Sequence, residues 1–467
     1  MLKRTRHIGI FTTGLTLVWI WLLATSCQLN SYQGKIVMVQ APADESESGS
    51  HFGLLDPAKE EVQPLLAEDK FFMVGSPDVS FDGERLLFEA KQNSNDKWQI
   101  WELYLKESDL KQITGADSDC RYPAYLPDGR IVYSRYVQDG ATAGYHVLET
   151  CDLSGDEKRQ ITFDPVDYSN SMVLRDGRLL VTAKQIHPFE EETQLMVMRP
   201  DGTKKELFYG AEGHLIQAHG ASETGEGLIV FSESKKEEKG GKLVSVHYNS
   251  PSNSKEELAP GSFGDFSSVN PGFSGELMIS FRTKPGNSYD LYSYDAGLDK
   301  ALKPLFSDPE FNTLDAKALV PRERPKKLPS AVDVEKHTAL LLCQDANFTG
   351  RAMNGSDRKA VRVELLGLHG SLGQADLEED GSVYLKVAAD VPFRMQTLDE
   401  EGSLVQGPSS WINLRPNERR GCVGCHAGSK RVPFNRQPLA VQKAPVEISK
   451  YSEAIMADAL KTDLTHE

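Results

Sequence analysis

Residues 82–91, DGERLLFEAK, place an Asp-Gly turn shortly before an apolar run, and this pattern recurs along the chain. Residues 128–137 read DGRIVYSRYV and residues 176–184 read DGRLLVTAK, at spacings of 46 and 48 residues. Asp-Gly pairs favour tight turns because glycine adopts positive φ without steric cost. Short strands with such turns at a period of about 40 to 50 residues are typical of β-propeller blades.

The repeat continues in a weaker form towards the C-terminus. Gly225 and Gly227 precede LIVFSES, and Gly275 precedes ELMISFR. A variable loop and a further strand, such as IWELYL or LMVMRPDG, follow each of the apolar runs. Five units are legible between Pro77 and Asp295. The units resemble Tol-type and WD-like periplasmic propellers, and this resemblance concerns architecture alone because propellers host many unrelated functions.

A sixth unit is expected from the two ends of the repeat region. The N-terminal segments KIVMVQ (35–40), FGLLD and EVQPLL have strand patterns, and so does LDAKALVP (314–321). Joining both ends in one blade would close the ring and remove exposed sheet edges. We therefore predict an all-β chain with a six-bladed propeller over residues 28–330, and seven blades as the alternative.

The repeat stops at VPRERPKKLPS (320–330), a Pro-rich and basic stretch that predicts a domain boundary. Beyond it, the strand-like runs are TALLLCQ, AVRVELLGL, SVYLKVAA and FRMQTLD, separated by Asp-Gly and Glu-Gly turns. These short alternating runs predict a small β-sandwich-like domain over residues 331–410. A haem-binding segment over 411–450 and a tail over 451–467 complete the predicted organisation.

The motif Cys422-Val423-Gly424-Cys425-His426 carries the clearest chemistry of the chain. Two thiols separated by two residues match the two vinyl groups of a haem, and the adjacent histidine falls under the iron as an axial ligand. The motif therefore predicts one covalent c-type haem, attached by Cys422 and Cys425, with iron bound by His426.

Three other interpretations of this motif compete with haem attachment. A thioredoxin-like redox pair needs a βαβ context, which this segment lacks. A structural zinc site needs a second pair of ligands nearby, and none follows His426. A disulfide between Cys422 and Cys425 is the third alternative, since close thiols often pair in an oxidising compartment.

The N-terminus has the pattern of an export signal. Basic residues at positions 3, 4 and 6 precede an apolar run over 8–24, which is shorter than a membrane-spanning helix requires. Small residues before Cys27 resemble a bacterial lipobox, which predicts cleavage of residues 1–27 and lipidation of Cys27. An uncleaved anchor is the alternative. Gln28 follows that cysteine rather than aspartate, which favours the outer membrane over the inner one.

The formal net charge of -16 argues against nucleic acid as a partner, because phosphate binding needs clustered Lys and Arg. It fits a periplasmic protein, and it favours docking to a basic redox partner protein.

The second ligand of the iron distinguishes electron transfer from chemistry on small molecules. Met395 on a sandwich strand is the first candidate, although methionine there is more often part of the core. The remaining candidates are His369 and His337 in the second domain, and His214 and His219 in the propeller.

Three cysteines remain after the lipid and the haem are assigned. Cys343 lies inside the apolar LLLCQ and predicts a buried thiol. Cys120 and Cys151 fall on different strands of one predicted blade, and a disulfide between them is an open alternative.

Several of these segments also carry a family resemblance. DAKALVPRERP, LLCQDAN, KAVRVELLG, DGSVYLKVAADVPFRMQTLDEEG and RPNERRGCVGCHAG are similar to the hydrazine synthase alpha-subunit-like family of bacterial multidomain cytochromes. With the propeller, the resemblance covers nearly all of the chain after residue 27. It implies a propeller followed by a haem domain, and it carries over Cys422, Cys425 and His426 alone as functional positions.

Two departures limit what the resemblance implies about the reaction. The true synthase subunit carries a second haem motif and works in a complex, whereas this chain has one motif. The tyrosine that the synthase places four residues after its motif histidine is Lys430 here. Hydrazine synthesis is therefore not expected.

Three functions follow from these observations. The first is electron transfer by an exported monohaem protein whose propeller serves as a docking surface. The second is a haem enzyme that acts on a small nitrogen compound or a peroxide. The third is a scaffold in which the propeller is the functional surface. No triad, phosphate loop or paired-carboxylate motif favours hydrolysis.

Overall fold

The computed structural model describes residues 32–44, 48–67, 69–138, 144–188, 193–210, 213–216, 220–235, 241–295, 299–348, 358–424 and 435–448. Within these ranges the secondary structure consists of β-strands and two short 3-10 helices, η1 (Pro251–Asn253) and η2 (Leu439–Gln442). The predicted all-β fold is confirmed. No helix in these ranges is long and apolar enough to span a membrane. The predicted signal segment and Cys27 lie outside them.

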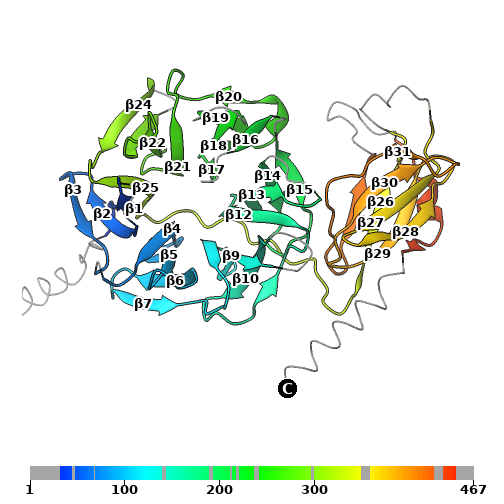
Figure 1. Ribbon diagram of the computed structural model, residues 1–467, viewed down its shortest axis with the longest axis horizontal. Helices are drawn as coiled ribbons and strands as arrows, with labels where there is room; N and C mark the ends of the chain where they lie inside the picture. The colour runs from blue at the N-terminus through cyan, green and yellow to red at the C-terminus, as the bar shows by residue number, and fades with distance from the viewer. Residues whose placement is uncertain are drawn as a thin grey trace, which may run out of the picture.

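The described residues before position 320 form six antiparallel sheets, which Figure 1 shows as a ring. The first contains β1 (Ile36–Pro42), β2 (His51–Asp56), β3 (Glu61–Pro64) and β25 (Phe311–Ala318). The second contains β4 (Met73–Val79), β5 (Arg85–Lys91), β6 (Gln99–Tyr104) and β7 (Asp109–Gln112). The third contains β8 (Cys120–Tyr125), β9 (Arg130–Val137), β10 (Tyr145–Asp152) and β11 (Arg159–Gln160).

The other three sheets follow in chain order. The fourth contains β12 (Val166–Val173), β13 (Leu179–Gln185), β14 (Gln194–Met198) and β15 (Glu206–Tyr209). The fifth contains β16 (His214–Ile216), β17 (Ser222–Glu223), β18 (Leu228–Lys235), β19 (Lys242–His247) and β20 (Glu256–Glu257). The sixth contains β21 (Asp265–Pro271), β22 (Leu277–Arg282), β23 (Asp290–Asp295) and β24 (Asp299–Phe306).

Apolar clusters between neighbouring sheets hold the ring together. Each pair of adjacent sheets shares one cluster, including the pair formed by the sixth sheet and the first, where Met278 packs with Ile36 and Met38. Strand β1 pairs with both β2 and β25, so segments about 270 residues apart form one sheet. This pairing covers the free edge of β1.

The Asp-Gly turns predicted from the repeat are confirmed. Gly83, Gly129 and Gly177 have φ values of 75°, 92° and 91°. In each turn the aspartate before the glycine accepts a hydrogen bond from the backbone N–H two residues later, at 3.0 to 3.1 Å. This side-chain bond fixes the turn that leads into the central strand of the sheet.

No disulfide joins Cys120 and Cys151, so that alternative is wrong. Strand β9 lies between β8 and β10, which puts the two cysteines two strand spacings apart. Two spacings are about 10 Å, beyond the reach of a disulfide. Both thiols are fully buried, and burial raises the pKa of Cys120 to about 11 and that of Cys151 to about 12. They are therefore unreactive core residues.

The second domain is a sandwich of two four-stranded sheets. One sheet has the order β32 (Arg419–Cys422), β26 (Thr338–Cys343), β29 (Val383–Ala388) and β33 (Val446–Glu447). The other has the order β28 (Gly370–Asp376), β27 (Arg362–Gly367), β30 (Arg394–Leu398) and β31 (Leu404–Gln406). Alternate residues of both sheets fill one core, among them Leu341, Leu385, Val363 and Leu365. The segment 411–450 thus supplies two edge strands of this sandwich.

Candidate haem-attachment site

The first cysteine of the haem motif is the last residue of edge strand β32. This strand runs parallel to β26, and the backbone N–H of Gln344 donates to the carbonyl of Cys422 at 2.9 Å. Cys422 is partly buried and packs against the sandwich core. Cys425, His426 and Lys430 lie outside the described residues. Strand β32 therefore fixes the position of Cys422, the first residue of the motif, at the edge of the sandwich.

Gly424 lies where a side chain would not fit. A Cβ atom at this position would overlap the carbonyl oxygen of Phe348 and come within 3.0 Å of the carbonyl oxygen of Asp345. The motif therefore leaves β32 in close contact with residues 345–348, the loop after β26. Glycine between the two motif cysteines permits this approach of two backbones.

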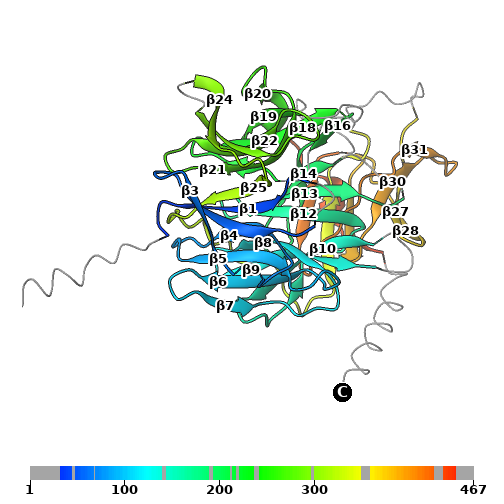
Figure 2. The same cartoon turned by 60° about the vertical axis from the view of Figure 1, so that its left-hand side comes forward.

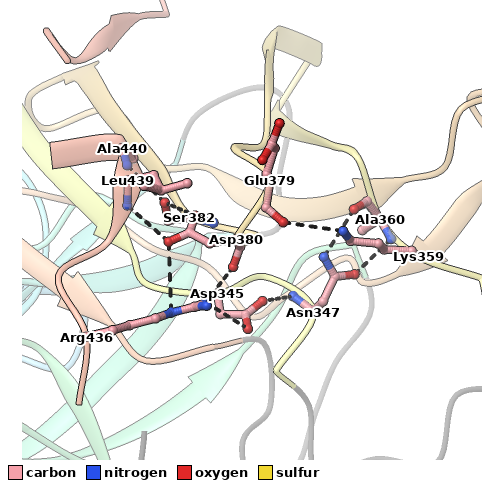
Figure 3. Close-up of polar contacts among 10 residues, drawn as sticks. All are labelled: Asp345, Asn347, Lys359, Ala360, Glu379, Asp380, Ser382, Arg436, Leu439 and Ala440. Atoms are coloured by element: carbon pink, nitrogen blue, oxygen red, sulfur yellow. Dashed lines mark hydrogen bonds and ion pairs between the residues drawn. The ribbon is translucent and has the colours of Figure 1, made fainter. Parts of the chain in front are cut away.

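After the motif the chain returns to the same end of the sandwich, and Figure 3 shows the polar contacts that it makes there. The Arg436 guanidinium donates to the carbonyl of Asp380 at 2.6 Å and reaches the carboxylate of Asp345 at 3.4 Å. The backbone N–H of Leu439 donates to the Asp380 carboxylate at 3.0 Å, and that of Ala440 donates to the Ser382 hydroxyl at 3.0 Å. Both flanks of the motif are thus held at one end of the domain.

Asp380 is the centre of this arrangement. Burial raises the pKa of its carboxyl group, but hydrogen bonds from Ser382 and from the backbone of Leu439, together with Arg436, outweigh burial and leave the pKa lowered. Asn347 extends the network, since its backbone N–H donates to the Asp345 carboxylate at 2.9 Å and its side-chain oxygen accepts from the N–H of Ala360 at 2.8 Å. The ionised carboxylate therefore links the turn before β29 to the chain after the motif.

The segment just before the motif docks on the propeller through Glu418. This carboxylate is 2% exposed, and it accepts hydrogen bonds from the backbone N–H of Lys204 and of Arg415, both at 2.9 Å. The guanidinium of Arg420 donates to it at 2.7 Å. Lys204 belongs to the fourth propeller sheet's loop before β15, whereas Arg415 and Arg420 belong to the second domain. Glu418 therefore joins the two domains four residues before Cys422.

A buried ion pair lies beside Glu418. The Lys205 ammonium contacts the Asp164 carboxylate, and it donates to Asn413 of the second domain at 2.9 Å and to the Tyr168 hydroxyl at 3.0 Å. Lys205 is 7% exposed and Asp164 is 1% exposed. Burial lowers the pKa of Lys205, although the neighbouring Asp164 opposes this effect. The Lys205 ammonium, the Asp164 carboxylate and the Asn413 amide are thus buried together in the interface between the domains.

Two further side chains complete the interface, and Figure 2 shows the sandwich beside the sheet of β12–β15. The Trp411 indole N–H donates to the carbonyl of His187 at 2.6 Å. Arg415 donates to the carbonyl of Asp201 at 3.1 Å and stacks over Phe163, 4.8 Å from the ring centre. This role of residues 411–420 is not evident from the sequence, because nothing local in it indicates which surface these residues contact.

The pH dependence of stability should report on Asp390 at this interface. Burial raises the pKa of its carboxyl group from 3.8 to about 6, despite the Arg415 guanidinium at 2.9 Å. Because the pKa is higher in the folded state, the protonated carboxyl group of Asp390 stabilises the fold. This stabilisation is fully present below about pH 4 and is lost as the pH rises through 6. We expect Asp390→Asn to remove up to about 3 kcal/mol of this pH dependence. Urea unfolding of both proteins between pH 4 and 7.5 measures it, and parallel curves would contradict it.

Four of the five candidate second iron ligands lie among the residues that the structure describes. Met395 pairs with Leu365 and packs against the core, His369 is exposed in the β27–β28 turn, and His337 is exposed before β26. His337 lies at the opposite end of β26 from Cys343, the residue paired with Cys422. His214 begins β16, and His219 lies outside the described residues. The second ligand stays a prediction.

A cavity of about 770 Å³ lies at the centre of the propeller ring. Its wall includes Ser76, Tyr122, Asn170 and Asp315, on four different inner strands, and all four have positive φ at strand irregularities. Positive φ is costly for residues other than glycine and is often associated with binding or catalytic sites. The cavity is therefore the second functional candidate in the fold.

Residues 320–330, which we call the strap, cross the ring on their way to the second domain, as Figure 1 shows. Arg322 donates to the Asp78 carboxylate at 2.9 Å, and Arg324 donates to the carbonyl of Pro127 at 3.3 Å. Both guanidinium groups lie over the Phe81 ring. The stretch that the sequence marks as a boundary is thus packed against the propeller and lines its cavity.

Two turns of the repeat provide a matched test of the strap. A Cβ at Gly177 would overlap the carbonyl of Lys326 in the strap, whereas a Cβ at Gly129 would meet nothing within 4 Å. Their φ values are nearly equal, so conformational strain on substitution is the same. We expect Gly177→Ala to cost about 2 kcal/mol more than Gly129→Ala. Thermal unfolding of both variants measures the loss of stability. Equal losses would show that the strap moves away from residue 177 at no cost in stability.

A ring of antiparallel sheets joined by a strap to a β-sandwich defines a two-domain propeller protein. Residues 334–427 match the family model described as the hydrazine synthase alpha subunit middle domain. Hydrazine synthase subunit alpha of Kuenenia stuttgartiensis is 23% identical over 514 aligned residues, which cover 82% of this chain and 63% of that protein. The chain thus spans less than two thirds of the length of this relative.

The solved structure of Kuenenia stuttgartiensis hydrazine synthase matches the fold with a TM-score of 0.75 at 19% identity. The match covers 88% of this chain and 71% of that chain, so both domains take part in it. These findings support an assignment to the hydrazine synthase alpha-subunit-like family. The resemblance stated from the sequence is confirmed.

Proposed function

We propose that this chain binds one haem covalently through Cys422 and Cys425, with His426 as an iron ligand, and passes single electrons. The observation that carries the proposal is that both flanks of the motif are anchored at one end of the sandwich. The bound haem would supply an iron that changes between two oxidation states. Cys422 would hold one side of the group, and Gly424 would let the chain turn away from β32.

The propeller, which we propose to be six-bladed, would serve as the docking surface for a redox partner. The net charge of -16 favours a basic partner protein. Lipidation at Cys27 would hold the chain on the periplasmic face of a membrane, with the outer membrane favoured. Glu418 and Lys205 would keep the haem domain at a fixed position on the ring, so that the distance between partner and haem is constant.

Haem staining after denaturing electrophoresis of the exported full chain tests covalent attachment. The wild type should keep its haem and show a c-type band in reduced-minus-oxidised spectra. Cys422→Ala combined with Cys425→Ala should abolish the stain. Cys120→Ala is the matched control, because it removes a buried thiol of the propeller and should retain the stain. A wild type without covalent haem would overturn the proposal.

A haem enzyme that acts on a small nitrogen compound or a peroxide is the second candidate. The similarity of residues 334–427 to the hydrazine synthase alpha subunit middle domain favours it. Lys430 and the single motif argue against hydrazine synthesis itself. The spectrum discriminates the two functions, since an enzyme needs an open iron position that binds carbon monoxide, whereas electron transfer is favoured by two permanent axial ligands.

A further inference from the structure

Cys343 lies directly opposite the first cysteine of the haem motif. In the parallel pairing of β26 and β32, Cys343 is in register with Cys422. Neighbouring strands are about 4.8 Å apart, which is within the Cα separations that disulfides span. The two cysteines come from positions 79 residues apart, so only the folded sandwich brings them together.

Both side chains belong to the same face of their sheet. Cys343 is 2% exposed and is a member of the sandwich core, and Cys422 packs against that same core from the edge strand. Residues in register on adjacent strands project to the same side. The inner thiol is thus covered by the core, and the outer one is reachable from solvent.

This difference in access assigns different chemical roles to the two thiols. The partly exposed Cys422 is the one that an external disulfide can reach, and the buried Cys343 is placed to attack the sulfur of Cys422 from the inside. Gly424 has already left the strand and packs on the carbonyl of Phe348. Among the described residues, Cys343 is the cysteine that the sheet holds beside Cys422.

We propose that Cys343 is the resolving thiol of Cys422, and that the haem-free chain stores these two residues as a disulfide. The inference rests on the proposed function, because it concerns the state of Cys422 before haem is attached. The disulfide would protect Cys422 from further oxidation and from pairing with Cys425. It would also block attachment at Cys422 until a reductant opens it.

The exchange is balanced in two steps. The Cys422 thiolate attacks a disulfide of a protein or small-molecule carrier, which forms a mixed disulfide and releases one carrier thiol. The Cys343 thiolate then attacks the Cys422 sulfur, which forms the S–S bond and releases the second carrier thiol. The two protein thiols lose two protons and two electrons, and the carrier disulfide is reduced. A dithiol reductant reverses both steps.

Disulfide mapping of the exported full chain, produced without a haem-attachment system, tests the proposal. Thiols are trapped with acid and alkylated, and the unreduced digest is examined by mass spectrometry. We expect a linked peptide that contains Cys343 and Cys422 in most of the chains, with Cys425 alkylated. Alkylated Cys343, with Cys422 either alkylated or linked to Cys425, would overturn the proposal.

Haem loading provides the second measurement. In a host that attaches haem, with reductant limiting, Cys343→Ser should raise the fraction of haem-bearing chain several-fold over wild type. Cys120→Ala is the matched control and should leave loading unchanged. Equal loading of wild type and Cys343→Ser would count against the block on attachment. Absence of haem from every variant, together with a Cys343–Cys422 linkage, would refute the haem function and leave the linkage established.

Discussion

Asp164→Leu should destabilise the protein by about 3 to 5 kcal/mol, because it leaves the Lys205 ammonium buried without its carboxylate. The remaining partners of this ammonium are the Tyr168 hydroxyl and the side-chain oxygen of Asn413, which carry no charge. Since Asn413 belongs to the second domain, part of the loss should appear as separation of the domains. Urea unfolding with limited proteolysis of the strap measures both effects.

The double variant Asp164→Leu with Lys205→Met is the control. Replacing a buried ion pair by apolar residues of similar size is often neutral or stabilising, so most of the lost stability should return. A double variant as unstable as the single one would show that the pair acts through packing that leucine and methionine do not reproduce. A single variant within about 0.5 kcal/mol of wild type would contradict a stabilising role of this ion pair at the interface.

Glu418→Ala should cost about 3 kcal/mol, because it leaves two buried N–H groups and the Arg420 guanidinium without their acceptor. The two N–H groups belong to Lys204 and Arg415, on opposite sides of the interface. Because Cys422 lies four residues further along the chain, the fraction of chains that carry haem should also fall. Chemical denaturation and intact-protein mass give the two readouts.

Glu418→Gln is the matched variant. It keeps one side-chain oxygen as an acceptor and removes the charge, so we expect a loss of about 1 to 2 kcal/mol and haem loading near that of wild type. If glutamine and alanine lower stability equally, the charge itself is what joins the domains. If neither affects stability or loading, Glu418 does not position the haem segment.

Local patterns in the sequence predicted much of the fold. Turn residues such as Asp128 and Gly129 adopt the expected conformation because a tight turn depends on a few adjacent residues. The pairing of the two ends of the repeat region in one sheet also agrees with the sequence pattern. Both segments have the alternating or continuous apolar residues that are typical of strands. The haem motif is equally local, because its chemistry depends on three residues within five positions.

The interface could not be predicted in this way. Glu418 meets Lys204 across 214 positions, and Trp411 meets His187 across 224. Charged and aromatic residues in an irregular segment suit many surfaces, and nothing in their own neighbourhood specifies one. The same limit applies to the strap, whose prolines and basic residues indicated a boundary and gave no sign that the segment would line a cavity.

The sequence by itself thus determined the all-β architecture, the repeat, the second domain and the position of Cys422, Cys425 and His426, because periodicity and motif spacing are properties of neighbouring residues. The tertiary structure alone decided that Cys343 is in register with Cys422, that Cys120 and Cys151 are kept apart by β9, and that Glu418 and Lys205 join the second domain to the ring. Each of these depends on strand order or domain docking, which is set by the summed burial of distant surfaces.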